Sequence, residues 1–324
     1  MLMHLITPKT FAVPLRAFYN MLMLPVILFT LQGSSLIVTK VGELKGEFIE
    51  AVRVTVCNDK VYVTDGFGYS IRIYSLDGLL KKELPLRKGS GPGEFKNGPS
   101  WISCNGDLVA VNDLSTPRIM LYDRDLNYLR EFRANSPGVT GVYIDRAGRV
   151  YVATWRGDKS VIQSFSAKGE FLKEFVVSGP NPKNAFLNIC KFGVLSSDRF
   201  VVVSPFSNRF KVLSKGGQEI MTGNVPGLPA SLSPDAFSDP LNPPLSNVVQ
   251  DVSASVDGRF WLLSGTAARQ PRRELFLYDH QGKLVATGIV PEALYSITAY
   301  RDGLLFGIKG NRTSVSIYRI KIVH

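Results

Sequence analysis

The chain repeats one pattern six times, and this repetition constrains its fold more than any other feature. Each copy contains a short apolar segment, a tight polar turn, a β-rich segment, a loop and a segment that closes on an aromatic residue or leucine. The clearest copies run from Val61 to Gly78 and from Leu108 to Leu126. The closing residues are Tyr74, Tyr122, Phe165, Leu213, Tyr278 and Tyr318, spaced by 48, 43, 48, 65 and 40 residues. A unit of this length holds four short strands, and four-stranded sheets repeated around an axis build a β-propeller.

Each copy also carries a hairpin signal followed by a strand signal. The turns use residues that tolerate tight or left-handed backbone: Asn58-Asp59, Asn105-Gly106, Ala147-Gly148, Ser197-Asp198, Asp257-Gly258 and Asp302-Gly303. The strands that follow are rich in β-branched and aromatic residues, which suits sheets buried between neighbours: Val61–Val63, Val109–Val111, Val150–Val152, Val201–Val203, Phe260–Leu262 and Leu304–Phe306.

The two ends of the repeat region complement each other. The last copy has three strand-like segments, near Tyr295–Tyr300, Leu304–Ile308 and Ser314–Ile320, and lacks a fourth. The segment Leu36–Lys40, before the first full copy, supplies one. Pairing the ends would remove an open sheet edge. We therefore predict an all-β fold, a six-bladed β-propeller closed by pairing of the N-terminal strand with the C-terminal blade, as a single domain over residues 36–324.

The repeat resembles the NHL-repeat family of six-bladed, TolB-like propellers. The matching elements are a strand ending in Val-x-Asp at Val63-Thr64-Asp65, an Arg-Ile strand at Arg72-Ile73-Tyr74 and again at Arg118-Ile119, and a glycine-rich linker from Gly89 to Phe95. The resemblance spans residues 36 to 324 and is strongest in the first two copies. It implies the fold and leaves the function open, since one fold hosts many functions.

Residues 1–35 have the pattern of a secretory signal peptide. The segment has Lys9 and Arg16 but no acidic residue, an apolar run from Met21 to Leu31, and small residues at Gly33 and Ser35. An uncleaved N-terminal membrane anchor and a misassigned start are the alternatives. We expect an exported protein, secreted, periplasmic or associated with the cell envelope, that meets the membrane only through this segment.

The three cysteines, Cys57, Cys104 and Cys190, are predicted to be small buried hydrophobic residues. An odd number at this spacing favours neither a disulfide framework nor a metal cluster.

The net charge of +11 would fall to +9 once a segment with two cations is removed. Many of the cations lie in loops joining the second and third strands of each copy, which should open on one face. Such a face attracts phosphate, acidic glycan or acidic protein, although a solvated basic surface is the simpler interpretation. The candidate ligand contacts are Trp155, Arg156, Lys159, Arg209, Arg272, Arg273 and Arg312.

The repeat is broken at Trp155-Arg156 and by a proline-rich insertion at about 226–247. The length of the insertion indicates a lid or a partner surface, or a passive excursion of the rim.

Catalytic and metal-binding signals are weak. The three histidines do not supply a zinc site, and His280 is expected in a turn on the face opposite the central pocket. Asp65 and Asp113 would be the obvious calcium ligands, yet both occupy a repeat position and are expected to accept hydrogen bonds from loop backbone or to meet the arginine of the third strand. The sequence identifies no catalytic residue, no metal ligand and no cofactor.

Three functional hypotheses follow. The first is a monomeric, non-catalytic binding module that recognises a protein, a glycan or another acidic ligand on its loop-bearing face. The second is a calcium-dependent, lactonase-like hydrolase or lyase, which needs at least three oxygen ligands on the axis. The third is nucleic-acid binding through the basic face, against which the signal-like N-terminus argues.

Overall fold

The computed structural model describes residues 34–136, 138–156, 159–177, 189–196, 199–232, 247–255, 257–267, 270–271 and 273–324. By its internal contacts the chain divides into residues 1–32 and residues 33–324, and the strands of the described residues all lie in the second unit. In the described ranges, no helix has the length and apolar character needed to span a membrane.

Four of the sheets formed by the described residues have four antiparallel strands each, in chain order from one edge to the other. The first contains β2 (Ala51–Cys57), β3 (Lys60–Asp65), β4 (Ser70–Ser75) and β5 (Leu80–Pro85). The second contains β6 (Pro99–Cys104), β7 (Leu108–Asp113), β8 (Arg118–Asp123) and β9 (Tyr128–Arg133). The third contains β10 (Gly138–Ile144), β11 (Val150–Arg156), β12 (Lys159–Phe165) and β13 (Phe171–Val176). The fourth contains β14 (Lys191–Ser196), β15 (Arg199–Val203), β16 (Arg209–Ser214) and β17 (Glu219–Asn224).

An eight-stranded sheet contains the remaining long strands, in the order β18-β19-β22-β23-β1-β26-β25-β24. Their bounds are β18 (Val249–Ala254), β19 (Phe260–Ser264), β22 (Glu274–Tyr278), β23 (Leu284–Ile289), β1 (Ser34–Glu43), β26 (Val315–Val323), β25 (Leu304–Lys309) and β24 (Leu294–Tyr300). The short strands β20 (Thr266–Ala267) and β21 (Gln270–Pro271) pair with each other, and a 3-10 turn, η3, covers Arg301–Gly303.

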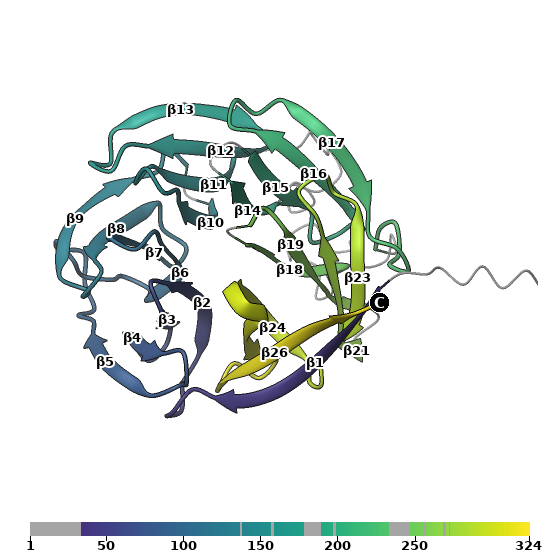
Figure 1. Cartoon of the computed structure of the whole chain (residues 1–324). Coiled ribbons are helices and arrows are strands. Elements are labelled where there is room, and N and C mark those ends of the chain that lie inside the picture. The colour runs from purple at the N-terminus through teal and green to yellow at the C-terminus, as the bar shows by residue number, and fades with distance from the viewer. Residues whose placement is uncertain are drawn as a thin grey trace, which may run out of the picture. The chain divides into compact units, whose positions relative to one another are not determined.

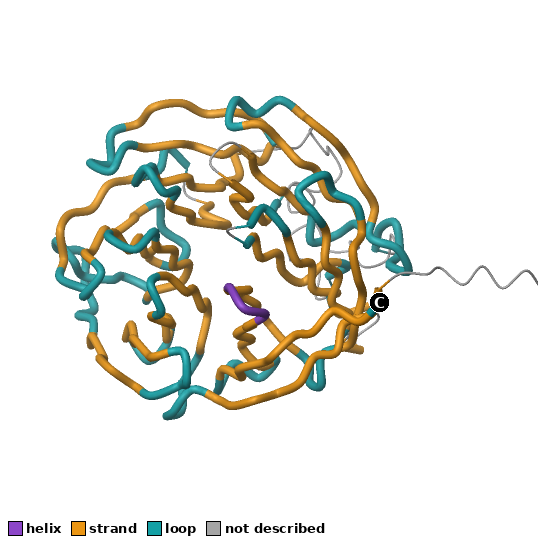
Figure 2. The backbone as a smooth tube through the Cα atoms, viewed as in Figure 1, coloured by secondary structure: helices purple, strands orange, loops and turns teal. Residues whose placement is uncertain are grey.

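The sheets of this unit stand around a common axis (Figure 1). The first strand of each four-strand run, namely β2, β6, β10, β14, β18 and β24, lies innermost, and the last strand lies at the periphery. Strands dominate the backbone, and the only helical turn in the described residues is η3 (Figure 2). This radial arrangement is that of a β-propeller.

The first described strand pairs with the last. β1 runs antiparallel to β26, with Leu36 opposite Ile322 and Lys40 opposite Tyr318. It also pairs in parallel with β23, where Ser34 lies opposite Ala286. The earliest and latest parts of the unit therefore share one sheet, as the adjacent purple and yellow strands show (Figure 1).

Four charged side chains, which we call the clasp, hold β1 against this sheet: Lys40, Glu43, Glu292 and Lys309. Lys40 Nζ lies 2.8 Å from Glu43 and 3.3 Å from Glu292, and Lys309 Nζ lies 3.1 Å from Glu43. Burial alone would raise the pKa of Glu43, but hydrogen bonds from lysine and serine side chains outweigh it and lower that pKa to about 2. The clasp therefore adds an electrostatic link between chain segments far apart in sequence.

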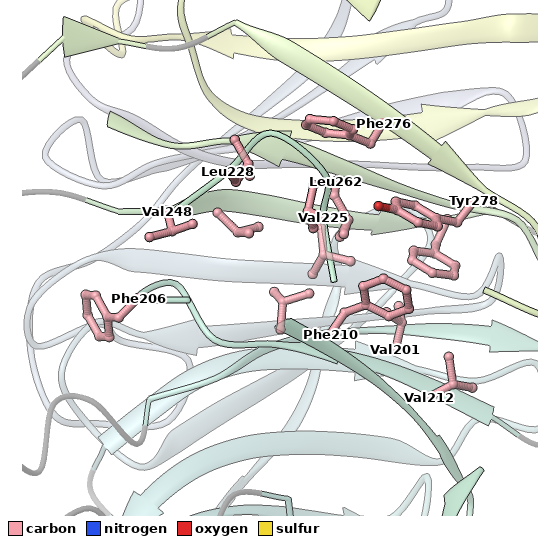
Figure 3. Packing of buried hydrophobic residues seen from close by; sticks show 14 of the residues in the cluster. Val201, Phe206, Phe210, Val212, Val225, Leu228, Val248, Leu262, Phe276 and Tyr278 are labelled. Atoms are coloured by element: carbon pink, nitrogen blue, oxygen red, sulfur yellow. The ribbon is translucent and has the colours of Figure 1, made fainter. Parts of the chain in front are cut away.

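Buried side chains fill the seams between neighbouring sheets. All six closing residues of the repeat are at most 2% exposed, so each lies in the core. In one seam Phe210 of β16 lies 4.9 Å, centroid to centroid, from Tyr278 of β22 (Figure 3). The Phe210 ring also lies 5.3 Å from that of Phe260 of β19. Aromatic and aliphatic residues of adjacent sheets thus pack against each other in the seam, with these two aromatic pairs in edge-to-face geometry, as the β-rich runs predicted.

Asp65 and Asp113 have the structural role predicted for them. Each carboxylate accepts hydrogen bonds from two successive amides of the linker that leads into its sheet. The donors are Ile49 and Glu50 for Asp65, and Lys96 and Asn97 for Asp113, at 2.8 to 3.0 Å. The arginine of the third strand lies within 3.8 Å of each. Because the same contacts recur in two sheets, these acids fix the linkers.

The prediction for two of the cysteines was wrong. Cys57, the last residue of β2, forms a disulfide with Cys104, the last residue of β6, with their Cα atoms 6.2 Å apart. Equivalent positions on adjacent innermost strands face each other across the seam, within the usual span of a disulfide. Cys190 is a buried free thiol, as expected, and burial raises its pKa to about 12.

Candidate functional site

A cavity of about 460 Å³ lies on the axis, and we call it the axial cavity. Its walls come from all six innermost strands, β2, β6, β10, β14, β18 and β24. On each of five of them the lining begins within the strand and continues into the turn that follows, as from Arg53 to Asn58 and from Trp101 to Asn105. The mouth therefore opens among the turns between first and second strands.

This position corrects one expectation about the pocket. The turn that holds His280 joins the third strand of its run, β22, to the fourth, β23, so it lies at the same end of the sheet as the turns around the mouth. The sequence placed His280 on the face opposite the pocket. The cavity opens at the end of the axis where His280 lies, because a buried polar cluster fills the other end.

The deep end of the axial cavity is formed by Arg53 and Trp101. The Arg53 guanidinium lies 4.6 Å from the centre of the Trp101 ring, in cation–π geometry. Its Nη1 donates hydrogen bonds to both carboxylate oxygens of Asp251, at 2.8 and 2.6 Å, and to the hydroxyl of Ser296 at 2.9 Å. Arg53 thereby connects β2 to β18 and β24 and contacts β6.

Asp251 is fully buried and completes its hydrogen bonding through β24. The Ser296 hydroxyl and the Ile297 amide donate to it at 2.9 and 2.8 Å. Burial alone would raise the pKa of Asp251, but the charges of Arg53 and Lys191 and these hydrogen bonds outweigh it and hold the pKa below its usual value. Asp251 is therefore a carboxylate fixed by its partners.

Lys191 extends this cluster to the fourth sheet. Its ammonium group donates to the backbone carbonyl of Gln250, whose side-chain amide donates to the Tyr295 carbonyl at 2.9 Å. Burial lowers the pKa of Lys191, and the Asp251 carboxylate opposes that effect. The inner strands β14, β18, β24 and β2 are thus joined by one chain of polar contacts below the cavity.

The middle of the axial cavity has hydroxyl groups that already bond to neighbouring strands. Ser103 accepts a hydrogen bond from the Ile144 amide at 3.0 Å. Ser253 does the same with the Ala299 amide at 2.9 Å, and Thr298 donates to the Val54 carbonyl at 2.5 Å. Between these groups lie apolar and aromatic residues: Ile102, Val142, Tyr143, Phe192, Val194 and Val252. Burial raises the pKa of the Tyr143 phenol, so its ring is neutral at physiological pH.

The mouth carries two arginines with different partners. The Arg301 guanidinium is paired with Asp59 at 2.5 Å. Arg146 is exposed, and its guanidinium makes no ion pair or hydrogen bond with the residues that the structure describes. Asp145, next to it, is 4% exposed and is bound by Lys215 and Arg149 at 3.3 and 3.2 Å. The available charge at the mouth is therefore positive.

The residues predicted from the sequence as ligand contacts lie at the other end of the sheets. Trp155 and Arg156 end β11, and Lys159, opposite Arg156, begins β12. Arg209 begins β16 and Arg312 lies in the turn between β25 and β26. They share a face but do not line the axial cavity.

Several of these side chains are engaged in internal contacts. Arg156 is paired with Glu174 at 2.5 Å, Arg273 donates to the Pro291 carbonyl at 2.7 Å, and Arg312 is paired with Glu50. Lys159 and Arg209 are exposed and have no ion pair among the described residues. Arg272 and most of the 226–247 insertion lie outside the described residues.

Sequence reasoning missed Arg53, Trp101, Asp251, Lys191 and Arg146. A signal was present for two of them, because Arg53 and Asp251 are charged residues within apolar strand segments, where a charge is buried only if paired. Their 198-residue separation concealed the partnership.

The described residues contain no cluster of three or more histidine, cysteine, aspartate or glutamate side chains arranged for a metal ion. Asp251, in the polar cluster beneath the axial cavity, is bound by Arg53.

Neither a known protein family nor a curated protein matches the chain in sequence. Solved structures do resemble it in fold. A protein from Bacteroides fragilis named as a candidate exported protein superimposes with a TM-score of 0.60 at 12% identity, over 89% of this chain and 96% of its own. The WD40 repeats of RRP9 superimpose with a TM-score of 0.58 at 12% identity, over 90% of this chain and 99% of their own. Virginiamycin B lyase from Staphylococcus aureus superimposes with a TM-score of 0.55 at 13% identity, over 88% of this chain and 99% of its own.

The chain is thus an all-β propeller. Its structural neighbours carry names of different kinds, a lyase among them, so the shared fold does not determine what this protein does.

Proposed function

We propose that this protein is an exported, non-catalytic propeller that binds an acidic ligand in its axial cavity. The observation that carries the proposal is the cavity itself. Among the described residues, Arg146 at its mouth is unpaired, and Asp145, the one acid of its lining, is neutralised by Lys215 and Arg149. Its volume falls in the range of small-ligand sites. The positive net charge of the chain favours approach of anions.

The architecture that best fits this proposal is a closed six-bladed propeller of the NHL type over residues 36–324. Six innermost strands line the cavity, and the eight-stranded sheet divides into two four-strand runs where β23 meets β1. In this interpretation β1 is the outer strand of the sixth blade, which its pairing with β26 supports.

Export is supported by two observations. The signal-like pattern of residues 1–35 precedes the propeller, and the Cys57–Cys104 disulfide is of a kind that persists in oxidising compartments. Cleavage of the N-terminal segment remains part of the proposal, and N-terminal sequencing of the exported protein tests it.

Titration calorimetry with acids that fit the cavity tests the function. Decanoate, 2-naphthoate, gluconate and citrate form a suitable panel, measured with the wild type and with Arg146→Glu. We expect at least one acid to bind with one site per chain and to lose its affinity in Arg146→Glu. If none of the four binds, the function proposed for the cavity is wrong.

A second candidate is the loop-bearing face predicted from the sequence, where Lys159 and Arg209 remain exposed and unpaired among the described residues. An acidic protein or glycan is the ligand expected there. The double variant Lys159→Glu/Arg209→Glu separates the two sites, because it reverses charge on this face and leaves the cavity intact. Loss of binding in this variant, with retention in Arg146→Glu, would favour the loop-bearing face.

A further inference from the structure

We propose that the ligand of the axial cavity is an amphipathic monocarboxylate, with an apolar chain or ring system in the cavity and its carboxylate at Arg146. This inference rests on the proposed function and narrows it to one chemical class. The ligand would enter with its apolar end first.

The cavity wall is the first reason. Below the mouth, the lining includes aromatic and aliphatic residues from several different sheets, among them Trp101, Tyr143, Phe192 and Val194. The Tyr143 ring lies 6.2 Å, centroid to centroid, from that of Phe192. A polar ligand such as a sugar acid would lose its hydration there without replacement by hydrogen bonds, which is unfavourable.

The second reason is that three hydroxyl groups of the wall already take part in hydrogen bonds between strands. The hydroxyls of Ser103, Ser253 and Thr298 are engaged with the backbone of neighbouring strands. At the deep end, the Arg53 side chain is paired with Asp251 at 2.6 Å and covered by Trp101. These groups hold the strands together, so a ligand with several hydroxyl groups would find few partners.

The third reason is the distribution of charge along the cavity. The deep cation has a buried counter-ion, and Arg301 at the mouth is paired with Asp59. Arg146 is exposed at the same mouth and is unpaired among the described residues. A single anionic group on the outer end of the ligand matches this arrangement, and a guanidinium binds a carboxylate with two parallel hydrogen bonds.

A chain-length series tests the apolar part. Hexanoate, octanoate and decanoate are titrated into the full-length exported protein by calorimetry. Each buried methylene is expected to tighten binding by about fourfold until the cavity is full. Equal affinities across the series would overturn the inference.

Paired ligands and variants test the orientation. Arg146→Gln should weaken decanoate by about tenfold and leave decanol unchanged, because only the acid uses the guanidinium. Arg130→Gln is the matched control, since it removes the same charge from an exposed position on β9 outside the cavity. Thr55→Trp places an indole in the cavity and should abolish binding of both ligands. Equal weakening of decanoate by Arg146→Gln and Arg130→Gln would refute the orientation.

The outcomes also distinguish this inference from the function on which it rests. If gluconate or citrate binds as tightly as decanoate and requires Arg146, the apolar-chain inference is wrong while the acid-binding function stands. If no acid binds, both are wrong.

Discussion

Removal of the Asp251 carboxylate should destabilise the protein more than removal of any exposed acid. Asp251 has no exposed surface, and the Arg53 side chain is 13% exposed. The change Asp251→Ala leaves the Arg53 charge buried without its counter-ion. It also removes the acceptor for the Ser296 hydroxyl and the Ile297 amide.

The expected cost is about 3–5 kcal/mol, the usual penalty for breaking a buried pair by removing one partner. That cost is a large fraction of the roughly 5–15 kcal/mol by which folded domains are stable. The matched control is Asp125→Ala, because Asp125 pairs with Lys60 at 2.7 Å but is 56% exposed. This exposed pair is expected to contribute less than about 1 kcal/mol.

Urea unfolding followed by tryptophan fluorescence measures both changes, with the free energy extrapolated to zero denaturant. The double variant Arg53→Met/Asp251→Leu provides a second test. Because it removes both charges and fills their space, it should recover most of the stability lost in Asp251→Ala. A cost below about 1 kcal/mol for Asp251→Ala would refute the role assigned to this pair.

Three further changes test other parts of the structure. The double variant Cys57→Ser/Cys104→Ser should lose about 2–4 kcal/mol in the same urea assay, because the disulfide closes a long loop across a sequence separation of 47. Gly98→Ala should lower the melting temperature more than Gly227→Ala, since both have positive φ but only Gly98 would place a Cβ against a backbone carbonyl, that of Gly66. Glu43→Gln should make stability less dependent on pH between about 4.5 and about 2, as measured by urea unfolding across that range.

The sign of the last prediction follows from the lowered pKa of Glu43. A depressed pKa in the folded state stabilises the protein above the unfolded value of 4.5, and this contribution disappears as the pH falls toward about 2. The Glu43 side chain is 36% exposed, so solvent screening limits the effect to about 1 kcal/mol. Identical pH profiles of wild type and Glu43→Gln would contradict this assignment. Equal melting temperatures of the two glycine variants would contradict the close approach inferred at Gly98. Full stability of the Cys57→Ser/Cys104→Ser variant would contradict the stabilising role of the disulfide.

The sequence predicted the strands well because their signals are local. Runs such as Val61–Val63 and Phe260–Leu262 are β-rich and adjoin turn residues, and they form β3 and β19. The repeat position of Asp65 was informative because its backbone partners lie near it in the fold, in the loop that follows its strand (Gly68) and in the linker into the same sheet (Ile49).

The candidate site could not be predicted in this way, since it depends on contacts between sheets. Arg53 and Asp251 belong to different sheets, and three four-stranded sheets lie between them along the chain. Cys57 and Cys104 became neighbours because their positions in adjacent sheets are equivalent, which spacing alone did not reveal. The charged loops, in contrast, were visible in the sequence, but their internal partners, such as Glu174 for Arg156, were not.

The crystal structure of the exported protein grown with decanoate is the most direct test of the proposed function. We expect the ligand in the axial cavity, with its chain against the aromatic residues Tyr143 and Phe192 and its carboxylate within hydrogen-bonding distance of the Arg146 guanidinium. An empty axial cavity, with decanoate bound on another surface or absent, would contradict it.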